Sequence, residues 1–123
     1  MPIYVRFETP SELQKQATEA IERARESGRV AKGTNEVTKQ VERGSAKLVV
    51  MAEDVSPEEI LAHMPLLCEE KGVAYLYVPT KAELGNAAGL GVGTAAIAVV
   101  DAGQAAEAID DLSKRAATLR ASK

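Results

Sequence analysis

The chain has 123 residues, of which 46% are hydrophobic and 27% charged, a composition that fits one globular domain and excludes a disordered chain. Its single cysteine, Cys68, excludes an internal disulfide and indicates a reducing compartment, with the thiol as a small buried group. The net charge of −3 argues against a protein that coats nucleic acid indiscriminately.

The chain begins without any targeting or membrane signal. Residues 1–6 lack the charged-then-apolar pattern of a signal peptide. No apolar run approaches the roughly 20 residues that a membrane helix needs. We therefore expect a soluble cytoplasmic protein without a membrane partner.

The first 46 residues predict two helices separated by a short strand. Thr9, Pro10 and Glu12 have the spacing of a capping box with proline at the first helical position. An apolar stripe then continues to a stop at Gly28. A strand over residues 29–32 and a helix over residues 34–43 follow. The stripe consists of Leu13, Ala17, Ala20, Ile21 and Ala24.

The middle of the chain predicts two buried strands around a broken helix. Residues 47–52 are too uniformly apolar for a one-sided strand, which favours a central position in a sheet. Ser56, Pro57 and Glu59 repeat the helix-start signature, and Pro65 predicts a kink or break. The inward residues expected here are Ile60, Leu61, Met64, Leu67 and Cys68, before Gly72 and a second strand over residues 73–78.

The last third repeats the alternation of helix and strand. Thr80 and Glu83 form a third capping box, opening a short helix that ends near Gly85 or Gly89. Residues 89–94 predict a mobile loop, 95–100 a strand and 102–119 a helix, with residues 120–123 expected to fray. This order predicts a single domain over residues 1–123, an α/β fold with a three-layer α/β/α sandwich around a four-stranded sheet.

The helix over residues 34–43 is the strongest candidate for a binding face. At about 100° per residue, Asn35, Glu36, Lys39 and Arg43 fall within one quadrant, opposite two valines. Glutamate only accepts hydrogen bonds and lysine only donates, so this pair suits base edges better than phosphates alone. The residues from Arg29 to Lys47 carry five basic and two acidic side chains, a local excess that favours RNA. The alternative is an ordinary solvated helix face.

The loop around Leu90, Gly91 and Val92 is the second candidate. Its glycines would present an exposed apolar pair on which an extruded base packs, although a plain connecting loop has the same composition. Thr94 occupies the place where a Gly-x-Gly-x-x-Gly fingerprint needs glycine, and no phosphate-loop lysine follows.

Catalytic and metal sites find little support. His63 has helical spacing with apolar neighbours and is interpreted as a packed histidine. Cys68 lacks a companion for a zinc site, and no nucleophile has an oriented base. Four carboxylates would suggest a cation site, but helix-start roles explain two of them; they are Glu53, Asp54, Glu58 and Glu59. We expect no enzyme activity and no cofactor.

These residues resemble a known family. The segments KGTNEVTK (32–39), VERG (41–44), AEDV (52–55) and MPLLCEEK (64–71) are similar to the archaeal ribosomal L-seven-Ae proteins and their relatives in box C/D and H/ACA particles. The similarity extends over nearly the whole chain. It implies an α/β/α sandwich with a mixed four-stranded sheet. Ala31, Ala74 and Gly91 depart from the lysine, proline and glutamate common in relatives.

The resemblance also implies a function without catalysis: binding of kink-turn and kink-loop RNA, with tandem sheared G·A pairs and an extruded nucleotide. Asn35, Glu36 and Lys39 would contact the guanines. Gly33, Thr34, Arg43 and Lys81 would hold the backbone, with Lys32 in the same segment, while Ile60, Leu90 and Val92 would pack on bases beside Gly91.

The partners implied are RNA molecules and their assembly proteins. They are ribosomal RNA, box C/D and H/ACA guide RNA, RNase P RNA, the Nop-domain scaffold with fibrillarin, and other ribonucleoprotein core proteins. Two alternatives remain: a protein-interaction module of the same fold, which would lack the Asn35, Glu36 and Lys39 face, and a small-molecule enzyme, which would need a nucleophile–base pair or phosphate loop.

Overall fold

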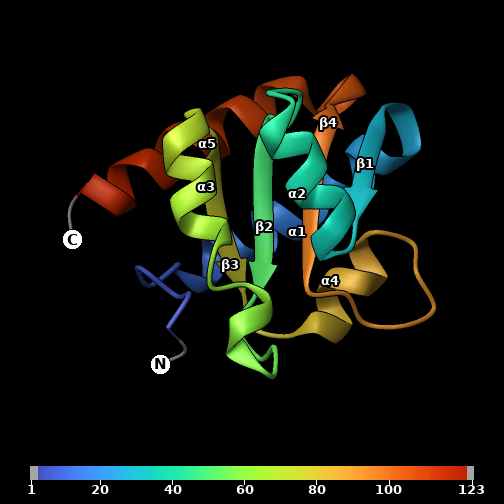
Figure 1. Cartoon of the computed structure of the whole chain (residues 1–123). Coiled ribbons are helices and arrows are strands. Elements are labelled where there is room, and N and C mark those ends of the chain that lie inside the picture. Colours follow the sequence, from blue (N-terminus) through green and yellow to red (C-terminus); the bar gives the residue numbers. More distant parts are fainter. Residues whose placement is uncertain (1–2, 122–123) are drawn as a thin grey trace.

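The computed structural model describes residues 3–121, and a four-stranded sheet forms its centre (Figure 1). The strands are β1 (Arg29–Lys32), β2 (Leu48–Ala52), β3 (Ala74–Val78) and β4 (Ala96–Asp101), in the spatial order β1-β4-β2-β3. Strand β4 is antiparallel to β1 and β2, whereas β2 and β3 are parallel. The mixed sheet implied by the resemblance is thereby confirmed.

Helices cover both faces of the sheet. Helices α2 (Thr34–Glu42) and α3 (Met64–Lys71) pack side by side on one face, in front of the sheet in Figure 1. Helices α1 (Ser11–Ser27), α4 (Lys81–Ala87) and α5 (Ala106–Ala121) cover the other face. Short 3-10 turns, η1 (Glu58–Ile60) and η2 (Gly103–Ala105), join these elements. The predicted three-layer sandwich is confirmed.

The core is mainly aliphatic, as predicted, but it also buries a cluster of aromatic rings: Tyr4, Phe7, Tyr75 and Tyr77. Strand β2 is buried along its whole length and lies between two neighbours, which confirms its predicted central position. The predicted apolar stripe of α1 is buried without exception. Cys68 is buried too. Its burial, and to a smaller extent the negative charge of Glu69, raise the pKa of its thiol to about 12. The thiol is therefore a packing group.

The three helix-start signatures have different outcomes. Thr80 is a true N-cap, because its side chain accepts the N–H of Glu83 at 3.1 Å. Thr9 is not, and that prediction was wrong: its buried Oγ1 instead accepts the N–H of Tyr77 in β3 at 3.3 Å. The Ser56 signature also fails, since only the short turn η1 forms there, and it is preceded by Pro57 without a side-chain cap hydrogen bond.

Pro65 breaks the predicted helix of residues 56–71, as expected. The chain forms the turn η1, then further turns, and α3 starts only at Met64 with Pro65 in its first turn. Gly72 ends α3 with a φ of 70°, a left-handed conformation that glycine adopts without strain. Because the helix is broken, Ile60 does not face inward and is 40% exposed, which corrects its predicted burial.

The C-terminal helix is longer than predicted. Helix α5 continues through Ala121, so Arg120 and Ala121 are helical, contrary to the expected fraying. Residues 122–123, to which that expectation also applied, lie outside the described part of the chain. Among residues 3–121 there is no helix with the length and apolar character needed to cross a membrane.

Candidate nucleic-acid interface

One end of the sheet brings together most of the predicted site. Strands β1, β2 and β3 end there, and β4 begins there, because β4 is antiparallel to β1 and β2 and β2 is parallel to β3. Helices α2 and α4 start at this end, and the loop of residues 89–94 leads into it (Figure 1). The predicted residues gathered at this end are Lys32, Gly33, Thr34, Asn35, Glu36, Lys39, Ile60, Lys81, Leu90, Gly91 and Val92.

Helix α2 is oriented by its two valines. Val37 and Val41 are fully buried under the helix, which turns the polar quadrant outward. Asn35, Glu36 and Lys39 are exposed there. Arg43 follows the helix at its other end, about 12 Å along the axis from Asn35. The structure therefore groups the first three residues, while Arg43 lies apart from them.

A buried glutamine, Gln40, supports the pair formed by Glu36 and Lys39, called the recognition pair below. The Lys39 ammonium lies 3.9 Å from the Glu36 carboxylate, and both side chains stay about half exposed. Gln40 is only 3% exposed, and its amide nitrogen donates to Glu36 Oε1 at 3.3 Å. Ser45 Oγ donates to Gln40 Oε1 at 2.5 Å. Sequence analysis missed Gln40, although its position four residues after Glu36 was an available signal.

The start of α2 is open to solvent. Gly33 precedes the helix with a φ of 91°, and no side chain caps the first turn. The first hydrogen bond of the helix runs from the Val37 N–H to the Gly33 carbonyl. The N–H groups of Thr34, Asn35 and Glu36 therefore have no acceptor within the helix. Such a helix start attracts anions through its free donors and its dipole.

A single backbone carbonyl joins α2 to the later loop. The Ala96 carbonyl, at the start of β4, accepts the N–H of Gly33 at 3.0 Å. It also accepts the hydroxyl of Thr94, which is 8% exposed, at 3.4 Å. The N–H of Thr94 donates to the Lys81 carbonyl at 3.1 Å. Thr94 was considered in the sequence only as a failed glycine position, yet it links the two halves of the site.

The loop of residues 89–94 is fixed by close backbone approaches at its glycines. A Cβ at Gly85, in α4, would lie 2.1 Å from the Val92 carbonyl oxygen. At Gly93 it would lie 3.0 Å from Cγ of Lys81. Gly91 has no atom within 4 Å of such a Cβ. The loop backbone is therefore held against α4, while the Val92 side chain is 73% exposed and Leu90 is partly buried against the core.

Lys81 begins α4 beside this loop. Its N–H donates to Asp54 Oδ1 at 2.8 Å, which ties the start of α4 to the end of β2. Its side chain is exposed and its stem lies against Gly93. Asp54 is therefore a structural partner of the site, a role that its sequence position did not reveal.

His63 is not the packed histidine that the sequence suggested. It is exposed at the start of α3, and its Nε2 lies 3.0 Å from Oγ1 of Thr38 in α2. The Thr38 hydroxyl donates to the Thr34 carbonyl at 2.8 Å, so it accepts from His63. This contact links α2 to the segment that carries Ile60, a long-range pairing with no local sequence signal.

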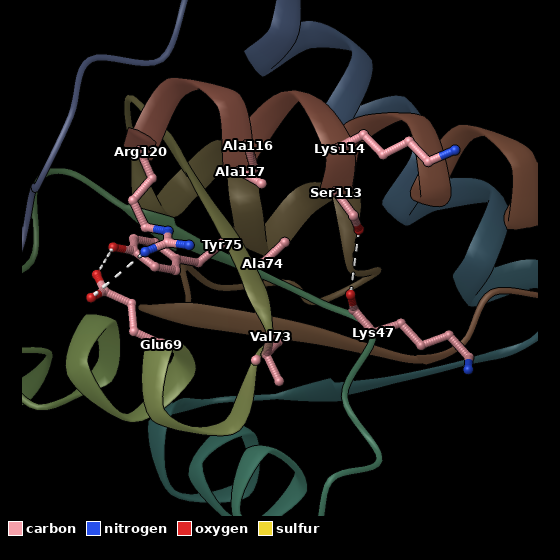
Figure 2. A pocket seen from close by; sticks show the side chains of 11 residues that line it. Lys47, Glu69, Val73, Ala74, Tyr75, Ser113, Lys114, Ala116, Ala117 and Arg120 are labelled. Carbon is pink, nitrogen blue, oxygen red and sulfur yellow. Dashed lines mark hydrogen bonds and ion pairs between the residues drawn. The ribbon is translucent and has the colours of Figure 1, made fainter. Parts of the chain in front are cut away.

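A further cluster of polar side chains lies away from this interface. Within residues 3–121, no three His, Cys, Asp or Glu side chains are grouped to hold a metal ion. A cavity of about 320 Å³ lies between α5 and the start of β3, at the opposite end of the sheet (Figure 2). There Tyr75 donates to Glu69 at 2.5 Å, and Arg120 lies 3.9 Å from the same carboxylate. Burial and the Glu69 hydrogen bond raise the pKa of Tyr75.

The chain is similar to a family of ribosomal proteins and to a solved RNA-binding protein. Residues 15–109 match the model of the ribosomal protein L7Ae/L30e/S12e/Gadd45 family. The large ribosomal subunit protein eL8 of Methanobrevibacter smithii is 56% identical over 118 residues, 96% of each chain. The solved structure of the Giardia lamblia 15.5kD RNA binding protein is 30% identical with a TM-score of 0.86. That match covers 97% of this chain and 98% of the Giardia protein.

Proposed function

Because the chain belongs to the ribosomal protein L7Ae/L30e/S12e/Gadd45 family, we propose that it is a non-catalytic RNA-binding protein that recognises and stabilises kink-turns and kink-loops. In such RNA, tandem sheared G·A pairs adjoin a sharp bend with an extruded nucleotide. The protein binds the bent form and thereby shifts the RNA toward it. It needs no cofactor for this role.

The observation that carries the proposal is the Glu36 and Lys39 pair on α2. The Glu36 carboxylate accepts from the N–H donors of a guanine, and the Lys39 ammonium donates to the acceptors O6 and N7. The two groups lie 3.9 Å apart, and Glu36 is further held by Gln40. Asn35, one position earlier, both donates and accepts. A purely electrostatic phosphate grip would gain nothing from Glu36.

Backbone contacts surround this pair. The open start of α2, with Gly33 and Thr34, suits a phosphate group. Lys32 and Lys81 are exposed at the same end of the sheet, and Arg43 extends the positive surface along α2. These cations supply affinity and orientation but little base selectivity.

The exposed apolar residues serve the extruded nucleotide. Val92 is 73% exposed and Ile60 is 40% exposed. Keeping these apolar side chains in water costs free energy in the free protein. Together with Leu90, and around Gly91, they offer surfaces on which unstacked bases pack. We assign the base-packing role to these residues.

The assemblies follow from the RNA class. We place the protein in the cytoplasm, on the large ribosomal subunit and on box C/D guide RNA, H/ACA guide RNA and RNase P RNA. In the guide particles it would prepare the bent RNA for the Nop-domain scaffold with fibrillarin and for other core proteins.

A paired binding experiment tests the proposal. Gel shifts compare a kink-turn RNA with the same RNA whose G·A pairs are replaced by Watson–Crick pairs, at one fixed salt concentration. We expect strong preference for the kink-turn and, with labelled RNA arms, an increase in energy transfer on binding. Equal affinity for both RNAs, or a bound RNA that stays unbent, would refute the proposed function.

A further inference from the structure

We propose that Arg25, in the last turn of α1, is an additional phosphate ligand that extends the RNA interface to the other face of the sheet. It lies outside the polar quadrant of α2 and outside the residues of α4. The inference rests on the proposed RNA-binding function, and it adds to that function a cation that no helix-face pattern had indicated.

The Arg25 side chain reaches the base-packing loop from α1. A Cβ built on Gly89 would lie 2.8 Å from Cδ, 2.9 Å from Nη1 and 3.0 Å from Cζ of Arg25. Arg25 is therefore packed over the backbone of Gly89, at the space that a side chain would fill. Gly89 has a φ of 79°, which ends α4 and starts the loop. The guanidinium thus lies at the start of the loop that carries Leu90 and Val92.

The charge of Arg25 is not used inside the protein. Among residues 3–121, its guanidinium has neither an ion pair nor a side-chain hydrogen bond. In α5, by contrast, Lys114 lies 3.1 Å from Asp110 and Arg115 lies 3.4 Å from Asp111. Arg25 lies beside Glu22 and Glu26 in the sequence and pairs with neither.

Packing and free charge together favour a phosphate. The contact with Gly89 restricts the side chain before RNA arrives, which lowers the entropy lost on binding. The planar guanidinium keeps its N–H donors in a fork that matches phosphate oxygens. An RNA whose extruded base packs on Leu90 and Val92 has its adjoining backbone within reach of this group.

The test measures kink-turn binding over a series of salt concentrations. The variants are Arg25→Gln, Arg25→Lys and a control, Arg23→Gln. Arg23 is exposed on the same helix. The Arg23 guanidinium is turned to the Gln104 carbonyl, at 2.8 Å, and away from the loop. Arg25→Gln should reduce the salt slope by about 0.7–0.9, the loss of one phosphate contact. Its affinity near physiological salt should fall about tenfold.

Each outcome decides the inference. Arg25→Lys should keep the slope, and Arg23→Gln should keep both slope and affinity. An Arg25→Gln protein with weaker binding but an unchanged slope would show that Arg25 only supports the loop, and would overturn the phosphate contact. Unchanged binding would overturn it as well. If the unaltered protein showed no preference for kink-turn RNA, the proposed function itself would fail.

Discussion

Gln40 controls the geometry of the recognition pair, although it faces inward. Its amide holds Glu36 from below while Ser45 holds the amide, so the carboxylate is positioned before RNA binds. The 3.6-residue period correctly predicted the buried valines and the exposed Asn35, Glu36 and Lys39. It did not predict a buried polar residue between the two faces, because that burial depends on Ser45 after the helix end.

The first prediction concerns Glu36. Glu36→Ala should weaken kink-turn binding by about 1–3 kcal/mol, because it removes the acceptor for a guanine edge. The matched control is Glu42→Ala, which removes an exposed carboxylate from the last turn of the same helix. That change should leave binding equal or slightly stronger, since a negative charge is lost near RNA. Titration calorimetry on one kink-turn RNA measures both.

A shared result would contradict base recognition. If the two variants strengthened binding alike, Glu36 would act only as a repulsive charge. The observed sign of the Glu36 effect therefore separates base reading from general electrostatics.

The loop of residues 89–94 behaves as a built element. Its flanks are fixed by Val92 against Gly85, by Lys81 against Gly93 and by the hydrogen bonds of Thr94. The sequence showed only glycines and an exposed apolar pair, from which mobility was expected. Glycine is equally needed where backbones approach closely, and composition cannot distinguish these two uses.

The second prediction compares two glycines of this region. Gly85→Ala should lower both thermal stability and RNA affinity, because the new methyl would meet the Val92 carbonyl at 2.1 Å. Helix propensity alone predicts the opposite, a gain of up to about 1 kcal/mol inside α4. Gly91→Ala is the control, since its site is open and its φ is not positive. Circular dichroism melts and gel shifts give the two readouts.

A stabilised Gly85→Ala protein with normal binding would mean that the loop does not depend on this contact. Loss of binding in Gly91→Ala alone would instead place the critical feature at the loop tip.

Element boundaries were predictable where local chemistry decides them. Thr80 caps α4 as its sequence indicates, and the strands begin or end within one residue of the predicted positions. Thr9 has the same signature but is drawn to Tyr77, 68 residues away, because the N-terminal segment covers the edge of β3. A cap residue that finds a tertiary partner cannot be recognised from three neighbours.

At the scale of the whole molecule, the two ends of the sheet differ in character. The interface end has exposed cations, an open helix start and exposed apolar side chains. At the opposite end, Glu69 is engaged by Tyr75 and Arg120 around the cavity of Figure 2. The basic segment from Arg29 to Lys47 contributes Lys32 and Lys39 to the interface end, whereas its Arg29 and Lys47 lie at the opposite end of the sheet.

The last prediction uses this asymmetry. On addition of kink-turn RNA, hydrogen exchange should slow in residues 32–43 and 81–94, where we place the contacts. Exchange should stay unchanged in residues 72–76 and 103–117, at and near the opposite end. Mass spectrometry of the free and bound protein measures it. Protection centred on residues 103–117 would move the interface away from the face proposed here.

The Ala96 carbonyl, which accepts two hydrogen bonds, has a consequence for protein engineering. The helix and the loop are both referenced to this carbonyl, at 3.0 and 3.4 Å, so the start of β4 sets their spacing. The segment 90–92 extends beyond this carbonyl and is tied to α4 at two points: the Leu90 N–H donates to the Gly85 carbonyl at 2.9 Å, and the Val92 carbonyl lies against Gly85. The exposed side chain of Val92 is therefore the one in this segment that can be exchanged without disturbing the core, while a deletion between Gly93 and Ala96 would separate the loop from α2.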